Sequence, residues 1–196
     1  MIRATHNKSM GFPPILCVLT AILFMLSSSL VGAEEKEFDL QVYLTKKQAF
    51  KIAFPGADKI DKEKKWLTDE QRKEIADLSH QRVDEKRLTF FVGKKNGKPM
   101  GYMLIGHRIG KSFPITYMVV LNIDGTVRDV EIMVYREPRG WEVRYESFLS
   151  QFFGRDADSD FREILSITGA TLSVNAITGG VQKAVAAYKV LYGSGR

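Results

Sequence analysis

Residues 166–173 read Ser-Ile-Thr-Gly-Ala-Thr-Leu-Ser and lie directly before a strong helical pattern. Apolar residues then recur at spacings of three and four, which predicts one buried face of an amphipathic helix. They are Val174, Ile177, Val181, Ala184, Tyr188 and Leu191. The run Gly193-Ser194-Gly195 is expected to end this helix. We therefore predict a turn of small residues that leads into a long C-terminal helix.

This turn has the features of an anion-binding site. Ser173 is predicted to be the N-cap of the helix, because a serine hydroxyl can accept a hydrogen bond from a first-turn amide. The remaining free amides and the helix dipole favour a negative group such as phosphate. Thr168 and Thr171 add two hydroxyls, and Gly169 and Ala170 let another group approach the backbone. An ordinary capped helix is the alternative, because such turns are common before helices.

The run from Thr168 to Ser173, Thr-Gly-Ala-Thr-Leu-Ser, resembles the signature of the FMN-binding domain family. That family includes the flavin subunits of the Rnf and Nqr redox complexes and the periplasmic flavin domain of NosR-type proteins. The resemblance implies that Thr171 carries covalent FMN through a phosphoester bond, made from FAD by a dedicated flavin transferase with loss of AMP. It also implies that Thr168, Gly169, Ala170 and Ser173 lie at the cofactor.

One position departs from the family pattern. The family usually has an aspartate three residues before the Thr-Gly-Ala-Thr run, and this chain has Leu165 there. Asp160 and Glu163 are acidic residues nearby. The departure bears on recognition by the transferase, so a flavin-free binding or scaffold module of the same fold stays open as an alternative.

A second stretch resembles the central block of the same family. Arg136-Glu137 with Gly140 and Glu142 is followed by Gln151-Phe152-Phe153-Gly154. The resemblance implies that Glu137 lies near the flavin in a supporting role. The block also contains aromatic residues, which at helical spacing pack into a core more often than they stack on a flavin. These residues are Trp141, Phe148, Phe152 and Phe153.

The N-terminal residues have the pattern of a targeting segment. Arg3 and Lys8 precede an uncharged and mostly apolar run over 11–32, and Val31-Gly32-Ala33 offers a small-residue cleavage site. We predict a signal peptide over 1–33 and a periplasmic or extracytoplasmic location. An uncleaved membrane anchor is the alternative, because the run is long enough to cross a bilayer.

Composition excludes several classes of function. Cys17 is the only cysteine of the 196 residues and lies in the leader, so the mature chain would have no disulfide, iron–sulfur ligand or thiol nucleophile. His80 and His107 alone are a poor zinc set, and we expect no metal site. Removal of the leader leaves 27 basic residues against 23 acidic ones, which gives little reason to expect nucleic-acid binding.

Local patterns predict an α+β fold. Capping-box spacings at Thr45–Gln48 and Thr68–Gln71 start two helices, which we assign to an N-terminal helical lobe over 34–86 of the same domain. The FMN-binding α+β domain is expected over 87–196. Its period-two runs predict an antiparallel sheet of hairpin-connected strands, flanked by N-terminal and C-terminal helices. The strands are expected at 88–92, 101–109, 115–122 and 127–135, with turns at Asn96-Gly97 and Asp124-Gly125.

A charged run and a pair of glycines are two further features of the sequence. Residues 58–65 alternate in charge, which is typical of a solvated face. Gly179-Gly180 interrupts the C-terminal helix at a cost of roughly 1 kcal/mol for each glycine relative to alanine. We hypothesise that this pair allows close approach of a neighbouring strand or of the flavin.

Together these features suggest an exported flavoprotein that carries covalent FMN and transfers electrons to or from a redox partner protein, with a membrane-bound protein as one candidate. A flavin-dependent reductase with its own substrate is the alternative enzyme. The sequence has no Ser/His/Asp set, no paired catalytic carboxylates at a recognisable spacing and no nicotinamide-binding glycine fingerprint. We therefore expect a carrier rather than an enzyme.

Overall fold

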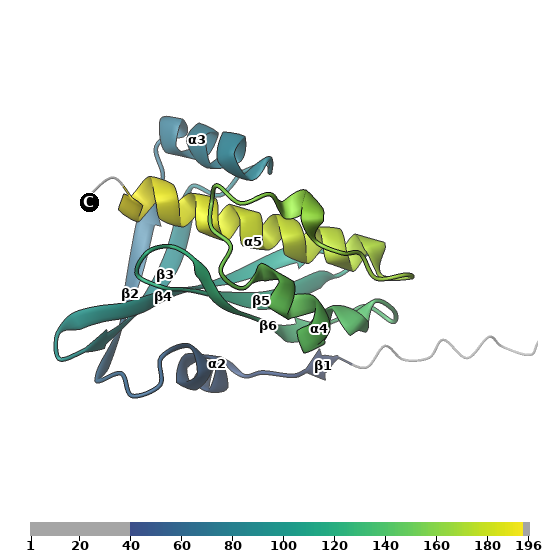
Figure 1. Ribbon diagram of the computed structural model, residues 1–196, viewed down its shortest axis with the longest axis horizontal. Helices are drawn as coiled ribbons and strands as arrows, with labels where there is room; N and C mark the ends of the chain where they lie inside the picture. The colour runs from purple at the N-terminus through teal and green to yellow at the C-terminus, as the bar shows by residue number, and fades with distance from the viewer. Residues whose placement is uncertain (1–39, 194–196) are drawn as a thin grey trace, which may run out of the picture. The chain divides into compact units, whose positions relative to one another are not determined.

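The core of the molecule is a six-stranded antiparallel sheet with helices on both faces, seen in a computed structural model that describes residues 40–193 (Figure 1). The strand order is β1-β6-β5-β4-β3-β2. This arrangement confirms the predicted α+β class. The predicted signal peptide over 1–33 lies outside the described residues. Within 40–193, no helix is long and apolar enough to cross a membrane.

The four predicted strands are present and form consecutive hairpins. They are β3 (Arg87–Lys95), β4 (Lys98–Ile109), β5 (Pro114–Leu121) and β6 (Val127–Tyr135). Asn96 and Gly97 connect β3 to β4 with φ values of 51° and 75°. Two consecutive residues with positive φ match the right-handed twist of the flanking strands, which explains why the Asn-Gly pair predicted this turn.

Two edge strands were not predicted. The charged run is β2 (Lys59–Trp66), which pairs with β3 from Lys59↔Lys94 to Trp66↔Arg87. Its residues alternate between exposed and half-buried, so the expected solvent exposure is correct, but the backbone is extended and paired. An edge strand rich in lysine resists pairing with other chains. The short β1 (Gln41–Val42) pairs with β6 at the opposite edge of the sheet.

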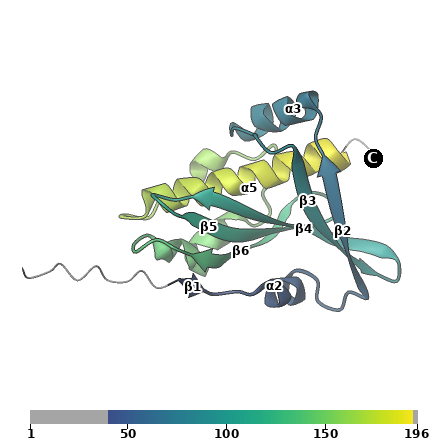
Figure 2. The same cartoon turned by 180° about the vertical axis from the view of Figure 1, so that it is seen from behind.

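Two capped helices lie on opposite faces of the sheet (Figures 1 and 2). Helix α2 (Lys46–Ala53) and helix α3 (Asp69–Ser79) both have the predicted capping box, formed by Thr45 with Gln48 and by Thr68 with Gln71. Apolar residues of α2 pack on the face that carries Met103 and Met118. Helix α3 packs beside the C-terminal helix on the other face, so each helix seals one side of the core.

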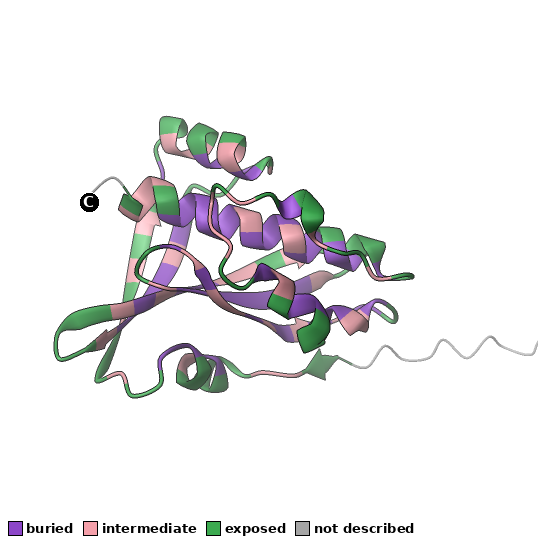
Figure 3. Ribbon diagram, in the orientation of Figure 1, coloured by how far each residue is buried: buried purple, intermediate pink, exposed green. Residues whose placement is uncertain are grey.

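The C-terminal helix α5 (Thr171–Tyr192) covers the face opposite α2, and its inner residues are buried (Figure 3). The predicted apolar face is confirmed, although Leu191 is only partly buried. The predicted N-cap is wrong. The helix begins at Thr171 with Ala170 as its cap, so Ser173 lies inside the first turn and is buried.

Short helical turns connect β6 to α5. They are η1 (Trp141–Arg144), α4 (Glu146–Leu149), η2 (Ser150–Phe152) and η3 (Phe161–Glu163). Phe148 and Phe152 are buried as expected, and Trp141 is half-buried against the core. The expectation for Phe153 is wrong, because its side chain is 43% exposed. It follows the last residue of η2, where the backbone becomes extended.

Tyr117 of β5 fills the space between the sheet and α5. A methyl carbon added to Gly180 would lie 2.2 Å from the Tyr117 hydroxyl oxygen, and one added to Gly106 would lie 2.4 Å from the same ring. Both distances are far below van der Waals contact, so neither position accepts a side chain without a shift. Gly180, the second glycine of the pair, thus permits close approach of β5 through a tyrosine side chain.

We expect Gly180→Ala to destabilise the protein by about 1–3 kcal/mol, because the methyl group would overpack the Tyr117 contact. This cost outweighs the roughly 1 kcal/mol that alanine gains in helix propensity. Gly193→Ala is the matched control, since a methyl there comes no nearer than 3.6 Å to Lys189 Cγ. Urea unfolding midpoints check both variants. A Gly180→Ala variant at least as stable as the wild type would contradict the packing constraint.

Candidate functional site

The first turn of α5 presents Thr171 to solvent. The turn before it contains Gly169 in the left-handed conformation, with φ of 83°, where a methyl carbon would meet no atom within 4 Å. Ala170 caps the helix without a side-chain hydrogen bond, and the amide of Val174 makes the first helical bond, 2.9 Å from the Ala170 carbonyl. The first-turn amides of Thr171–Ser173 therefore have no capping side chain, which favours an anionic ligand.

Ser173 joins this turn to the loop that follows β6. Its hydroxyl lies 2.8 Å from the hydroxyl of Tyr135, which also donates to the Arg139 carbonyl over 2.7 Å. Burial raises the pKa of Tyr135 to about 12. A methyl carbon on Gly140, at φ of 85°, would lie 2.7 Å from the Ser173 hydroxyl oxygen. Ser173 is thus a structural tie at the wall of the site.

Glu137 fixes the β4–β5 hairpin to the end of β6. Its side chain is buried, with 6% exposed, and its Oε1 accepts hydrogen bonds from the amides of Ser112 (2.6 Å) and Phe113 (2.8 Å). Gly110 passes close by, since a methyl carbon there would lie 3.1 Å from the same oxygen. A carboxylate that accepts hydrogen bonds from two backbone amides holds their loop firmly in place.

These elements enclose a cavity of about 690 Å³ at the start of α5. It is lined by Lys111, Glu137, Pro138 and Arg139, and by residues 169–173. The structure thereby brings together five of the six residues that the sequence proposed as cofactor-binding. The sixth, Thr168, is exposed and does not line the cavity.

Lys111 and Arg139 are site residues that the sequence analysis did not identify. Lys111 comes from the β4–β5 hairpin and Arg139 from the loop after β6, far from each other and from Thr171 in sequence. Within the part of the chain that the structure describes, neither forms a salt bridge. Nothing in their local pattern distinguishes them from other surface cations, so only the fold reveals them.

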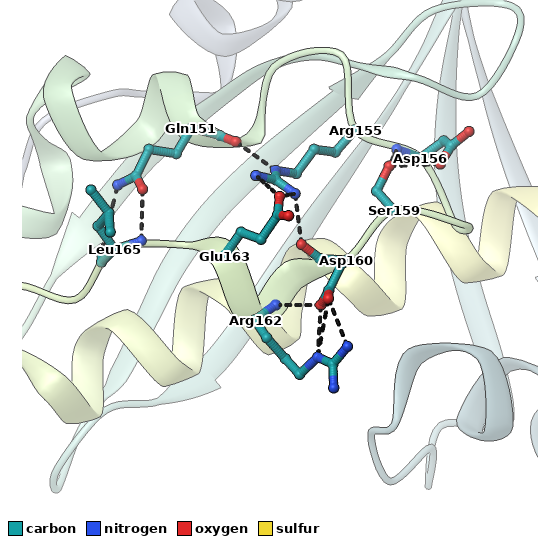
Figure 4. Close-up of polar contacts among 8 residues, drawn as sticks. All are labelled: Gln151, Arg155, Asp156, Ser159, Asp160, Arg162, Glu163 and Leu165. Atoms are coloured by element: carbon teal, nitrogen blue, oxygen red, sulfur yellow. Dashed lines mark hydrogen bonds and ion pairs between the residues drawn. The ribbon is translucent and has the colours of Figure 1, made fainter.

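A polar network holds the segment that leads to the site (Figure 4). Arg155 lies at its centre, where its side chain donates to the Gln151 carbonyl (2.8 Å) and the Asp160 carbonyl (2.7 Å). It also pairs with Glu163 at 3.4 Å. Asp160 binds the side chain of Arg162 at 2.7 Å, and these bonds lower the pKa of Asp160 to about 2. The segment over 151–165 is therefore fixed through backbone carbonyls as well as side chains.

Leu165 takes part in this network only through its backbone. Its amide donates to Gln151 Oε1 over 2.7 Å, while its side chain is 73% exposed (Figure 4). The position of the family aspartate is thus open to solvent, and no packing requirement accounts for leucine there.

The two described histidines have structural surroundings. His107 Nδ1 lies 3.0 Å from the Thr116 hydroxyl, and partial burial together with the positive charge of Arg136 lowers the pKa of His107. His80 ends α3 in the left-handed conformation. Among residues 40–193, no group of three or more histidine, cysteine, aspartate or glutamate side chains could hold a metal ion.

The part of the chain that forms the cavity matches a known protein family. A family model described as "FMN-binding domain" matches residues 110–186. This range begins in the β4–β5 hairpin and ends in α5, so it contains every residue that lines the cavity. Residues 110–186 therefore resemble the FMN-binding domain family.

Two curated relatives support this assignment. The chain is 26% identical over 120 residues to one subunit of a Na(+)-translocating ferredoxin:NAD(+) oxidoreductase complex from Acetobacterium woodii, covering 55% of this chain and 58% of the relative. It is 29% identical over 106 residues to one subunit of a proton-translocating ferredoxin:NAD(+) oxidoreductase complex from Clostridium ljungdahlii, covering 49% and 57%. The match thus spans less than two thirds of either relative.

The residues that line the cavity fit a flavin phosphate. Lys111 and Arg139 supply two positive charges to its lining, and the exposed Thr171 lines the same cavity. The uncapped first turn of α5 adds backbone amides that favour the same anion. Thr171 is also the first residue of the helix, where a negatively charged group interacts favourably with the helix dipole.

We expect Glu137→Ala to destabilise the FMN-binding domain by about 1–3 kcal/mol, because the amides of Ser112 and Phe113 would lose a charged acceptor. Glu137→Gln keeps one acceptor oxygen and should cost less. Glu74→Ala, on the exposed side of α3, is the control and should change stability by no more than about 0.5 kcal/mol. Thermal unfolding of the three variants measures the difference. Equal stability of Glu137→Ala and the wild type would refute this role of Glu137.

Proposed function

We propose that this protein is an exported flavoprotein that holds FMN covalently on Thr171 and transfers electrons. The observation that carries the proposal is the position of Thr171. Thr171 is an exposed residue that lines a cavity with two cations, at an uncapped helix start, within the range matched by the FMN-binding domain model. This arrangement suits a permanently bound phosphodiester, which remains negatively charged after attachment.

The attachment reaction needs an accessible hydroxyl and an activated phosphate. We propose that the Thr171 oxygen attacks the FMN-side phosphorus of FAD, that the hydroxyl loses its proton, and that AMP leaves as the pyrophosphate bond breaks. Lys111 and Arg139 would stabilise the charge that develops on the phosphate oxygens. A flavin transferase would supply the remaining catalytic groups, as the family resemblance implies.

The electron-transfer role rests on the cofactor and on the relatives. When bound, the isoalloxazine ring supplies the redox chemistry, and the chain contributes position and electrostatics. The matched relatives are named as subunits of ion-translocating ferredoxin:NAD(+) oxidoreductase complexes, which supports a membrane-bound redox partner for this protein. Export by the N-terminal segment would bring the domain to the periplasmic or extracytoplasmic side, where a covalent bond prevents loss of the cofactor.

Export with the transferase present should give a protein heavier by one FMN less one water, with flavin fluorescence that survives a denaturing gel. We expect Thr171→Ala to lose both signals completely, because the attacking hydroxyl is gone. Thr168→Ala is the matched control, since Thr168 is exposed in the same turn but does not line the cavity. It should keep full loading. Intact mass spectrometry reads all three proteins, and a loaded Thr171→Ala variant would exclude the proposed linkage.

Leu165→Asp tests the position at which the chain departs from the family. Because this side chain is 73% exposed, we expect the stability to change by no more than about 0.5 kcal/mol. We expect the loaded fraction under limiting transferase to be at least as high as in the wild type. Leu172→Asp, which replaces an exposed leucine on the cavity wall, is the contrast and should reduce loading by charge repulsion with the phosphate. Intact mass after short induction measures both, and reduced loading of Leu165→Asp would overturn this expectation.

A further inference from the structure

The alternating charges of β2 are sorted between the two faces of the sheet. Glu63 accepts a hydrogen bond of 2.8 Å from the hydroxyl of Tyr192 at the end of α5, so its side chain lies on the α5 face. Asp61 is two residues away and lies on the same face, because side chains alternate along a strand. It pairs with Lys59 and Lys94, each at 2.8 Å. Both acidic residues of β2 therefore lie on the α5 face.

The opposite face of β2 carries a row of cations and apolar side chains. This β2 row consists of Ile60, Lys62, Lys64 and Trp66, all four exposed, with 69% of Trp66 accessible to solvent. Lys62 is directly opposite Phe91 of β3, which packs against α2, so the row lies on the α2 face. Among residues 40–193, neither lysine of the row forms a salt bridge. Two cations without counter-ions thus lie between an exposed isoleucine and an exposed tryptophan.

More positive charge adjoins the β2 row on β3 and α2. Arg87 is directly opposite Trp66, and its guanidinium carbon lies 5.3 Å from the centre of the indole ring. Lys46 of α2 has its Nζ 4.6 Å from the centre of the Phe91 ring, which is opposite Lys62. Helix α2 has no acidic residue, and all three of its lysines are exposed. The β2 row is therefore the centre of a larger cationic patch.

Within the described strands, the acidic residues of the α2 face lie far from the β2 row. They are Asp129 and Glu131, which are opposite Val120 and Met118 in the core beneath α2. Both belong to β6, and three strands lie between β6 and β2. The cations of the patch therefore repel one another, and a negatively charged surface outside the protein would relieve this repulsion.

We propose that the β2 row, together with Arg87 and the lysines of α2, binds the anionic headgroups of a lipid bilayer. Lysine and arginine side chains gain free energy close to such a surface. Trp66 and Ile60 enter the boundary between the headgroups and the acyl chains, where an indole ring is favoured. The four side chains of the row span about 20 Å along the strand, so a flat bilayer can contact all of them.

An exposed indole favours a bilayer over an acidic protein as the partner. A folded acidic partner has to supply a pocket for Trp66 as well as carboxylates for the lysines. A bilayer accepts both anywhere on its surface, because its interface joins a charged layer to an apolar one. Protection of a sheet edge against pairing explains the lysines alone, since an exposed tryptophan and isoleucine do not serve it.

This surface is independent of the cavity that contains Thr171. Tyr192, which contacts Glu63 of β2, is the last residue of α5, and Thr171 is the first. A helix of 22 residues spans about 33 Å, so β2 and the cavity lie toward opposite ends of α5 (Figure 1). A bilayer on the β2 row would therefore leave Thr171 accessible to a protein partner, and the proposal holds with or without bound FMN.

Trp66 and Trp141 are the two tryptophans of the chain, so each can be observed alone. The experiment uses exported protein prepared without the flavin transferase, which prevents quenching by covalent flavin. In Trp141→Phe, we expect Trp66 emission to move to shorter wavelength on vesicles of equal parts phosphatidylcholine and phosphatidylglycerol, and brominated lipid to quench it several-fold. Vesicles of phosphatidylcholine alone should give neither change. In Trp66→Phe, the half-buried Trp141 should stay unquenched.

Three outcomes would overturn the proposal. Equal Trp66 signals on the two kinds of vesicle would do so, because an apolar leader retained on the chain inserts into both. An unquenched Trp66 on anionic vesicles would leave an acidic protein as the partner of the patch. Quenching of Trp141 would show that another face of the protein meets the lipid.

Lys62→Gln combined with Lys64→Gln tests the charge of the β2 row. Each cation near an anionic surface contributes about fivefold to the vesicle partition coefficient, so we expect the double variant to bind about 25-fold more weakly. Lys73→Gln combined with Lys189→Gln is the matched control, because it removes the same net charge from exposed lysines of α3 and α5. It should weaken binding far less. Titration of each protein with anionic vesicles, followed by Trp66 emission, measures the partition coefficients, and equal losses would contradict a role of the β2 row.

Discussion

The distance between α5 and the sheet depends on one contact, in which the Tyr117 side chain packs against Gly180 and Gly106. A side chain on either glycine would displace the ring, and the helix could not lie as close to β4 and β5. Because α5 is a continuous helix from Thr171 to Tyr192, a shift at Gly180 would move its first turn as well. The packing of Tyr117 thus determines the position of Thr171 relative to the β4–β5 hairpin.

Two residues of the cavity wall hold neighbouring segments together, and others contribute polar groups that suit an anionic ligand. Glu137 uses one carboxylate oxygen on two hairpin amides, and Ser173 uses its hydroxyl on Tyr135. These side chains hold three segments together: the hairpin, the loop after β6 and the start of α5. Lys111 and Thr171 line the space that these segments enclose. This division explains why the central block and the small-residue turn, which are distant in sequence, belong to one site.

Local signals in the sequence predicted most elements but not the contacts between distant segments. The capping boxes and the Asn96-Gly97 turn predicted their elements correctly, because their signals lie within a few residues. β2 was missed because its alternating charges hide an edge strand, which is defined by its pairing with β3. Ser173 was misjudged because its partner, Tyr135, lies 38 residues away. Lys111 and Arg139 could not be recognised, since their role depends only on the fold.

In the proposed function, one hydroxyl at the first residue of the last helix carries the flavin. Fragmentation mass spectrometry of the tryptic peptide over 163–183, from exported and transferase-treated protein, determines which hydroxyl is modified. We expect a phospho-flavin adduct on Thr171 alone, with Ser166, Thr168, Ser173 and Thr178 unmodified. An adduct on any of these other hydroxyls, or an unmodified peptide from yellow protein, would contradict it.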